Sequence, residues 1–448
     1  MLNRCVVHWL FLIFLFTFSA HLRAQSRSLF SFNKIEDVNG ALAEKKLYGV
    51  ENPQYDGAYW SGLAGLETWQ YPWPFVRWDK IQIDYPTASA SLKHRYYTGK
   101  VPAHFHQGTD GKLFIFFGTS FTGFDRGTWT SKLTYYTLGK YPQSSILFFP
   151  GYLSEETLEV AGAPFPDPSL KFIARDYLIR IVSFLNQKKK EGIFYNKIGT
   201  IGSSGGATIA LRIQEEERRF RKLKNWPQNL FSWGNLALSP VVDPATACRV
   251  TDAQANFVES KAGFSKSYSI YDWVVLKKLF GWFPGVVKAT VPSLLKLSRT
   301  PQHKSYVKFR DLVVYNAIQE IELLNKYQSP DYTGEHRFTP YYESYSFNKI
   351  KALYPEYKKF SYDDFATMRT AAQQIDRPNR VVFSLDDPLL SAPVLLNLPM
   401  TANPRVTSIL EKFRRNSNFK VDQFPHGGHL GYYIDSDYFS SLFEETFR

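Results

Sequence analysis

Short apolar runs and longer amphipathic segments follow one another along most of this chain. Continuous apolar runs of this length are typical of buried parallel strands, and they occur at about residues 112–117, 144–149, 197–201, 230–238, 380–385 and 419–424. Segments with helical periodicity lie between them, at about residues 128–138, 169–190, 205–220 and 406–414, with a closing one from about 437. This alternation implies right-handed crossovers, so we expect an α/β fold with a mostly parallel central sheet and helices on both faces.

Two long segments depart from this alternation and divide the chain. Residues 25–90 are rich in Tyr, Trp, Pro and Gly without sustained periodicity, so we expect an irregular N-terminal extension. Short strand-like runs follow at about 92–97 and 100–106. Residues 248–370 interrupt the core and carry basic, aromatic-rich helical patches at about 271–280 and 310–326. We therefore predict a large lid inserted between a first part of the core, residues 91–247, and a second part, residues 371–448.

The lid prediction centres on an amphipathic segment between residues 271 and 284. Trp273, Phe280 and Trp282 lie there among lysines. Apolar side chains on such a segment can line a substrate groove while the lysines stay in water. Packing of the segment on the core is favoured, and peripheral contact with a membrane is the alternative.

The first 24 residues have the order of a secretory signal peptide. A positive start at Arg4 is followed by a short apolar segment, from Trp9 to Ala20, and by a small residue at Ala24. The apolar segment is shorter than the roughly 20 residues that span a bilayer. We therefore expect export with cleavage after Ala24, and an uncleaved N-terminal membrane anchor is the alternative. Cleavage would leave Cys248 as the single thiol, so the core alone must hold the exported fold without a disulfide.

Charge and histidine spacing narrow the expected partners. The formal net charge is +13, and basic residues are spread along the chain. This pattern is typical of a solvated basic surface, or of attraction to an anionic lipid or an acidic substrate. No nucleic-acid-binding motif accompanies the charge, so nucleic acid is not an expected partner. His104 and His106 share one face of a predicted strand without a third ligand nearby in the sequence, so we expect no metal site and no cofactor. The sequence gives no indication of the oligomeric state.

The strongest chemical signal is Gly202-Ser203-Ser204-Gly205-Gly206, between a predicted strand and a predicted helix. It fits Gly-x-Ser-x-Gly, in which the serine lies on a sharp strand-to-helix turn and the flanking glycines let strand and helix approach. The new helix points its N–H groups toward charge that develops beside Ser204. We therefore predict Ser204 as a nucleophile, and a plain tight turn is the alternative.

A serine nucleophile needs a base, and the base needs an acid that orients it. His426 and His429 follow the last predicted strand, and His429 is favoured because the glycines around it suit a loop that brings an imidazole to the serine. Asp386 and Asp387 follow the preceding predicted strand. Asp387 is favoured because the turn at the next proline would aim it toward the histidine loop. Asp243, beyond the run at 230–238, is the reserve acid.

The tetrahedral intermediate of such a reaction carries a negative oxygen that needs two N–H donors. Gly205, the residue after the nucleophile, is one candidate donor. Thr119, in the loop after the run at 112–117, is the other. Pro150-Gly151, after the next apolar run, is a competing choice for the second donor.

Four motifs in chain order resemble the α/β-hydrolase superfamily: Phe-Gly-Thr-Ser at 117–120, Gly-x-Ser-x-Gly at 202–206, Asp-Asp-Pro at 386–388 and Gly-Gly-His-Leu-Gly at 427–431. The last two, with Tyr-Tyr-Glu-Ser-Tyr-Ser at 341–346, are similar to a branch of membrane-associated esterases and lipases. The resemblance implies the α/β-hydrolase fold and a triad of Ser204, Asp387 and His429. It also implies hydrolysis of a small-molecule or lipid ester through an acyl-enzyme. The signal, the extension and the long insertion depart from that branch.

Two other functions stay open. A peptidase or an acyltransferase would use the same triad, because the triad fixes the mechanism and not the leaving group. A catalytically idle protein of this fold would instead serve as a lipid-binding or envelope interaction module. A complete triad in the expected chain order favours an enzyme over such a module.

Overall fold

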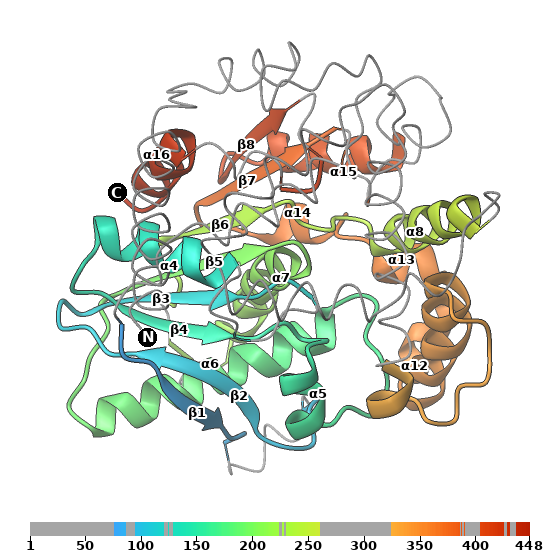
Figure 1. Cartoon of the computed structure of the whole chain (residues 1–448), viewed down its shortest axis with the longest axis horizontal. Coiled ribbons are helices and arrows are strands. Elements are labelled where there is room, and N and C mark those ends of the chain that lie inside the picture. The colour runs from blue at the N-terminus through green and yellow to red at the C-terminus, as the bar shows by residue number, and fades with distance from the viewer. Residues whose placement is uncertain are drawn as a thin grey trace, which may run out of the picture.

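The computed structural model describes residues 76–86, 95–120, 124, 129–223, 226–227, 230–259, 324–385, 387, 389, 404–424, 428–430 and 436–448. These residues form an eight-stranded sheet with helices around it (Figure 1). The strands are β1 (Asp79–Ile83), β2 (Val101–His106), β3 (Lys112–Phe117), β4 (Ser145–Phe149), β5 (Lys197–Ser203), β6 (Gly234–Leu238), β7 (Asn379–Ser384) and β8 (Phe419–Phe424).

The helices connect the strands or belong to the insertion. They are α4 (Trp129–Lys140), α5 (Glu155–Ala161), α6 (Lys171–Lys190), α7 (Gly205–Phe220), α8 (Pro244–Glu259), the π-helix η5 (Pro340–Ser346), α12 (Phe347–Leu353), the 3-10 helix η6 (Pro355–Lys359), α13 (Tyr362–Ala366), α14 (Ala371–Gln374), α15 (Pro404–Arg415) and α16 (Ser436–Thr446). Among the described residues, no helix combines the length and the apolar character needed to cross a membrane.

The strand order across the sheet is β1-β2-β4-β3-β5-β6-β7-β8. β2 is antiparallel to β1 and β4, and all other pairings are parallel. This order, with one antiparallel strand near the start of an otherwise parallel sheet, is that of the α/β-hydrolase fold. The fold prediction is therefore confirmed. Because parallel strands end at one edge of a sheet, the loops after β3 to β8 meet at that edge.

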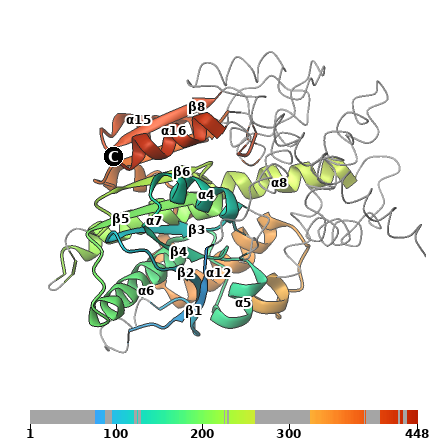
Figure 2. The same cartoon turned by 60° about the vertical axis from the view of Figure 1, so that its left-hand side comes forward.

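Helices cover both faces of the sheet, as the sequence predicted (Figure 2). α4 and α16 pack together on one face, over buried side chains such as Phe116, Phe148 and Leu236. α6 and α7 pack together on the other face, over Ile115, Phe117 and others. α14 and α15 continue this second layer beside α7 and β8.

Four buried polar side chains form a ring across the middle of the sheet. Thr200 on β5 donates to Asn235 on β6, and Asn235 donates to Asn379 on β7, both at 2.7 Å. Asn379 donates to Gln214 on α7 at 2.9 Å, and Gln214 donates back to Thr200 at 3.5 Å. Buried polar groups are costly unless they are paired. The polar ring therefore favours a single register of β5, β6 and β7 and a single position of α7.

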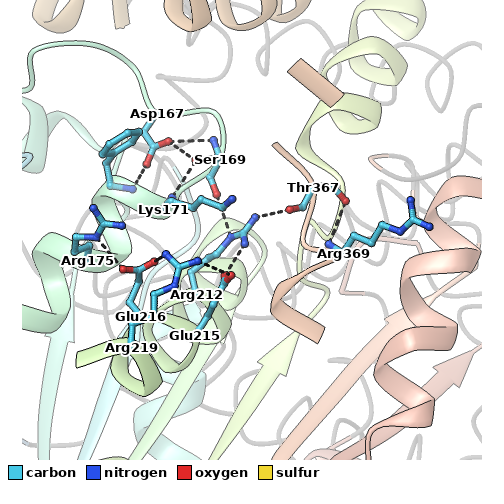
Figure 3. A network of polar contacts seen from close by, with 11 residues as sticks. Asp167, Ser169, Lys171, Arg175, Arg212, Glu215, Glu216, Arg219, Thr367 and Arg369 are labelled. Atoms are coloured by element: carbon cyan, nitrogen blue, oxygen red, sulfur yellow. Dashed lines mark hydrogen bonds and ion pairs between the residues drawn. The ribbon is translucent and has the colours of Figure 1, made fainter. Parts of the chain in front are cut away.

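A second polar network holds α7 against its neighbours (Figure 3). Arg212, fully buried on α7, donates to the backbone oxygens of Ser169 and Thr367 at 3.3 and 2.7 Å, and pairs with Glu215 at 2.6 Å. Asp167 caps α6 by accepting amide hydrogen bonds from the first turn of that helix. These contacts tie α7 to the start of α6 and to the chain after α13.

The predicted bounds of β3, β8 and α7 match the structure, whereas several other elements were missed or wrong. β1 lies inside the segment that we expected to be irregular, and α5 and α8 were not predicted. The run at 92–97 is not a strand over its described residues, 95–97. Tyr96 and Tyr97 instead donate their amides to the buried carboxylate of Asp176, at 2.9 and 3.2 Å. That carboxylate takes the hydrogen bonds that a neighbouring strand would have accepted.

The described part of the insertion before α14, residues 324–366, packs into the main core. The rings of Tyr354 and Phe172 on α6 lie 4.9 Å apart, and Ser346 donates to the backbone oxygen of Pro166. The hydroxyl of Tyr327 lies 3.1 Å from carboxylate oxygens of α5. The predicted lid residues Trp273, Phe280 and Trp282 lie outside the described residues, as do the signal segment and most of the extension, so those assignments stay predictions.

Candidate active site

Ser204 lies on the sharp turn between β5 and α7. Its backbone has φ 57° and ψ −126°, a conformation that non-glycine residues rarely adopt. The Ser204 amide donates to Leu238 on β6 at 2.8 Å, and the Ser204 carbonyl accepts from Ala207 at 3.0 Å. Ser204 is 8% exposed. The strained turn is therefore held from both sides, and it presents a serine at the carboxyl edge of the sheet.

Two glycines let the strand and the helix meet this closely. A Cβ on Gly206 would lie 2.8 Å from the carbonyl carbon of Phe117 and closer still to the oxygen. A Cβ on Gly202 would lie 2.6 Å from the amide nitrogen of Ala207. Both neighbours are backbone atoms, which cannot rotate away as a side chain can. The Gly-x-Ser-x-Gly spacing therefore meets a packing requirement of this turn.

His429 and Asp387 form a hydrogen-bonded pair at the same edge of the sheet. His429 Nδ1 lies 2.7 Å from Asp387 Oδ2, and the Asp387 side chain is fully buried. The other carboxylate oxygen, Oδ1, accepts from the Leu389 amide at 2.8 Å. This backbone contact orients the carboxylate in the loop after β7. When Nδ1 carries the proton and donates a hydrogen bond to Asp387, Nε2 is the basic nitrogen of the ring. A general base requires this tautomer.

The histidine loop is linked to the serine turn through the end of β6. Leu238 accepts the amide of Ser204, and the hydroxyl of the next residue, Ser239, accepts the amide of Leu430 at 3.3 Å. Ser239 and Leu430 have φ values of 47° and 71°, so the chain turns sharply at both positions. The two hydrogen bonds are therefore made by adjacent residues at the end of β6, Leu238 and Ser239. The structure thus brings the serine turn and the His429–Asp387 pair to one edge.

The reserve acid, Asp243, is engaged elsewhere. It is fully buried just beyond β6, where it pairs with Arg405 and accepts from the Thr246 hydroxyl at 2.8 Å. Its carboxylate is therefore held at the start of α8, whereas Asp387 contacts the histidine. Asp386 and His426 lie outside the described residues, so the preference for their neighbours stays a prediction.

The loops after β3 and β4 lie side by side next to the serine turn. The Gly118 amide donates to Phe149 at 3.0 Å, and the Leu153 amide donates to Ser120 at 2.7 Å. β3 is also the direct neighbour of β5 in the sheet. The order of strands therefore carries both loops to the side of Ser204 that faces away from β6.

Gly205, the first residue of α7, faces these two loops. A Cβ on Gly205 would collide with Ser120 Oγ and would lie 2.9 Å from the ring of Tyr152. Thr119, the predicted second N–H donor, directly precedes Ser120, and its role and that of Gly205 stay predictions. Ser120 and Tyr152 were not predicted as site residues from the sequence. A polar side chain one residue beyond Pro150-Gly151 was the signal that could have found Tyr152.

The two histidines considered as metal ligands have other contacts. His104 Nε2 lies 2.9 Å from Glu156, and its ring stacks on Phe124 with centroids 3.6 Å apart. His106 Nδ1 lies 3.2 Å from a backbone oxygen. Burial raises the pKa of Glu156, but hydrogen bonds with His104 and Lys80 outweigh burial and lower that pKa to about 2. Across the described ranges, no cluster of three or more His, Cys, Asp or Glu side chains is arranged to hold a metal ion.

Comparisons with known proteins give matches to solved structures. No protein-family model matches this chain, and no curated protein matches it. The esterase Pf2001 of Pyrococcus furiosus shares 11% identity, covers 83% of this chain and 89% of its own, and gives a TM-score of 0.42. An acylaminoacyl peptidase of Pyrococcus horikoshii shares 10% identity, covers 83% of this chain and 42% of its own, and gives 0.40. A proline iminopeptidase of Mycobacterium smegmatis shares 9% identity, covers 82% and 97%, and gives 0.38. Similarity at this level carries no information about substrate or reaction.

Proposed function

We propose that this protein is a serine hydrolase that cleaves carboxylic esters through an acyl-enzyme on Ser204, with His429 as the base and Asp387 as the acid. One observation carries the proposal. A serine on a strained turn at a helix N-terminus shares an edge of the sheet with a histidine whose Nδ1 lies 2.7 Å from a fully buried carboxylate. A plain tight turn requires neither the histidine nor the carboxylate, and an idle binding module gains nothing from a buried charge beside an imidazole.

The chemistry follows from these three side chains. His429 Nε2 takes the hydroxyl proton while Ser204 Oγ attacks the ester carbonyl carbon, and the π electrons of the carbonyl move onto its oxygen. When the tetrahedral intermediate collapses, the bond to the alcohol breaks and the alcohol leaves with the proton from His429. Water then attacks the acyl-enzyme in the same way, which releases the acid and restores Ser204. Asp387 stabilises the imidazolium in each half of the reaction.

A fluorophosphonate probe tests the nucleophile. We expect the wild-type protein to be labelled and Ser204→Ala not to be labelled, because only an activated serine reacts with the probe. Ser203→Ala makes the same change one residue earlier and serves as the matched control, which should keep its labelling. Thermal unfolding checks that each variant is folded. Labelling that survives in Ser204→Ala would place the nucleophile elsewhere.

Turnover of a chromogenic ester tests the base and the acid. His429→Ala should lower turnover by several orders of magnitude, as loss of a triad member does, whereas His426→Ala should have a small effect. Asp387→Asn should be severe because it removes the charge that stabilises the imidazolium, and Asp386→Asn should be mild. Reversed effects within either pair would move the role to the neighbouring residue.

The proposed substrates are esters with an apolar acyl group, either small molecules or lipids. The support is the composition of the insertion, where Trp273, Phe280 and Trp282 lie among lysines. Replacing these three residues with serine should lower turnover of long-chain esters far more than turnover of acetate esters. Only a long acyl chain would extend from Ser204 as far as the lid. An equal loss at every chain length would reject the lid. If the protein cleaved peptide amides faster than any ester, the proposed esterase activity would be wrong and a peptidase would be the better assignment.

We propose further that the protein is exported and that it contacts membranes peripherally. The signal-like order of residues 1–24 supports export, and the net charge of the full chain, +13, supports attraction to anionic lipid. An intact mass that begins at Gln25 would agree with cleavage, and a mass that retains residues 1–24 would favour the anchor. Co-sedimentation with anionic but not neutral vesicles tests the membrane contact.

A further inference from the structure

Two hydroxyl-bearing side chains lie against the residue that follows the candidate nucleophile. A Cβ on Gly205 would lie 2.1 Å from Ser120 Oγ and 3.3 Å from the Tyr152 hydroxyl oxygen. Ser120 comes from the loop after β3, and Tyr152 comes from the loop after β4. The absence of a side chain at Gly205 therefore makes room for these two groups beside the helix N-terminus.

The two hydroxyls form a hydrogen-bonded chain. Ser120 Oγ donates to the Tyr152 oxygen at 3.3 Å. Accepting this hydrogen bond uses a lone pair of the phenol oxygen, and a phenol can act both as an acceptor and as a donor. Because hydrogen bonds in a chain polarise one another, a donated bond from Ser120 makes the Tyr152 hydroxyl a better donor.

Hydrogen bonds hold the chain directly after Tyr152 in place. The next residue, Leu153, donates its amide to Ser120 at 2.7 Å. Ser154 caps α5 by accepting from the Thr157 amide at 3.3 Å, so the chain direction is set two residues after Tyr152. Tyr152 itself is buried. A side chain held in this way needs little reorganisation when charge appears beside it.

Tyr152 belongs to the large buried cluster on the α6 and α7 face of the sheet, which also contains Phe149, Tyr177 and Tyr342, so its surroundings have a low dielectric constant. Burial, and next the Tyr152 hydroxyl, raise the pKa of Tyr342 on η5. Burial and other nearby groups, Tyr152 among them, likewise raise the pKa of Tyr177 on α6. In such surroundings a hydrogen bond to a developing charge is stronger than it is in water.

We propose that the Tyr152 hydroxyl, supported by Ser120, donates a hydrogen bond to the substrate carbonyl oxygen as it becomes negative, beside the backbone N–H of Gly205. The proposal rests on the function proposed above, because it concerns the intermediate formed on Ser204. Tyr152 keeps its proton throughout. The proton of Ser204 goes to His429, and the oxygen that gains the carbonyl electron pair is stabilised by donation alone. Preorganised donors of this kind act mainly on the transition state.

Tyr152→Phe removes the hydroxyl and keeps the ring, so it tests the donor. We expect kcat to fall about 100-fold, within the range for loss of one such donor, with KM nearly unchanged. Ser120→Ala should lower kcat about tenfold. The two changes together should cost little more than Tyr152→Phe alone, because both act through one hydroxyl. Tyr177→Phe is the matched control, since this tyrosine packs in the same cluster with its ring 4.8 Å from Phe149, and it should keep wild-type kcat.

Inhibition by a trifluoromethyl ketone distinguishes a hydrogen-bond donor from a residue with a structural role only. This inhibitor forms a tetrahedral oxyanion on the serine, so its inhibition constant in Tyr152→Phe should rise by the same factor by which kcat/KM falls. Wild-type kcat in Tyr152→Phe, or a change in KM alone, would overturn the donor role. If Tyr152→Phe fails to fold, Ser120→Ala with an unchanged inhibition constant would overturn it instead. Fluorophosphonate labelling of Ser204 in the same variants separates this failure from failure of the serine-hydrolase proposal, in which the wild-type protein itself would not be labelled.

Discussion

Replacing Gly206 with alanine adds a single carbon atom where α7 passes the end of β3. That atom would lie 2.8 Å from the carbonyl carbon of Phe117 and closer to two carbonyl oxygens, whereas ordinary contacts begin near 3.4 Å. The strand and the helix must therefore separate by roughly 1 Å at the oxygens. β3 is held by β4 and β5, and α7 is held by Arg212 and Gln214. The displacement is therefore expected to concentrate at the serine turn, which is already strained.

Two effects of this substitution have different magnitudes. Inserting a methyl group into a packed region typically costs about 1–3 kcal/mol of the free energy of unfolding. A misplacement of about 1 Å in a reacting group costs roughly 100-fold in rate. We therefore expect urea unfolding to report a loss of about 1–3 kcal/mol, and both ester turnover and the rate of fluorophosphonate labelling to fall about 100-fold in protein that is still folded at 25 °C.

Gly139→Ala is the matched control. A Cβ on Gly139, near the end of α4, meets no atom within 4 Å. Alanine is the better helix former by up to about 1 kcal/mol, so this variant should be as stable as the wild type or slightly more stable, with unchanged labelling. If Gly206→Ala instead kept wild-type stability and labelling, the spacing of glycines around Ser204 would have no packing role.

Two further changes test the polar interior. Asn235→Ala removes the residue of the polar ring that lies on β6, between Thr200 and Asn379. The Thr200 hydroxyl then loses its acceptor and Asn379 Oδ1 loses a donor, and both groups are buried. Urea unfolding should show a loss of about 2–4 kcal/mol, with normal turnover per folded molecule; a loss below about 1 kcal/mol would contradict this account. Burial, and then the charge of Arg212, lower the pKa of Lys171 to about 8. Because folding lowers this pKa from its unfolded value near 10.5, the protonated amine weakens the fold at any pH below about 8, and the effect fades as the pH rises toward 10.5. Lys171→Met should therefore raise Tm at pH 7 and raise it less at pH 10, and an equal gain at both would refute the assignment.

The parallel strands were predictable because both of their faces are buried. Such strands read as continuous apolar runs, of which Leu-Phe-Ile-Phe-Phe at 113–117 is one. β1 was missed because it is a partly exposed edge strand, Asp-Lys-Ile-Gln-Ile, with no such run. α5 was missed because seven residues are too few to show a helical period.

The candidate triad could be predicted because each member follows a recognisable strand, and strand ends meet at one edge of a parallel sheet. The roles of Tyr152 and Ser120 could not be predicted, because their approach to Gly205 depends on the position of β3 between β4 and β5. Chain order does not specify that position. The sequence left Asp243 open as an acid because its partner Arg405 lies 162 residues away. Interactions over such distances are set by packing and not by local pattern.

The pairing of β6 with β7 has a consequence for folding. Asn235 bonds Asn379 across this pair, 144 residues along the chain, the longest separation between paired strands in the described sheet. Closing a flexible loop of that length costs roughly 4 kcal/mol in chain entropy before the new contacts contribute. The turn at Ser204 can form among β3, β5 and β6, which all precede the insertion, whereas Asp387 and His429 arrive when β7 and β8 dock. We therefore expect a folding chain to hold its serine without a base until the last strands pair, so the proposed hydrolase activity would be the last property that folding confers.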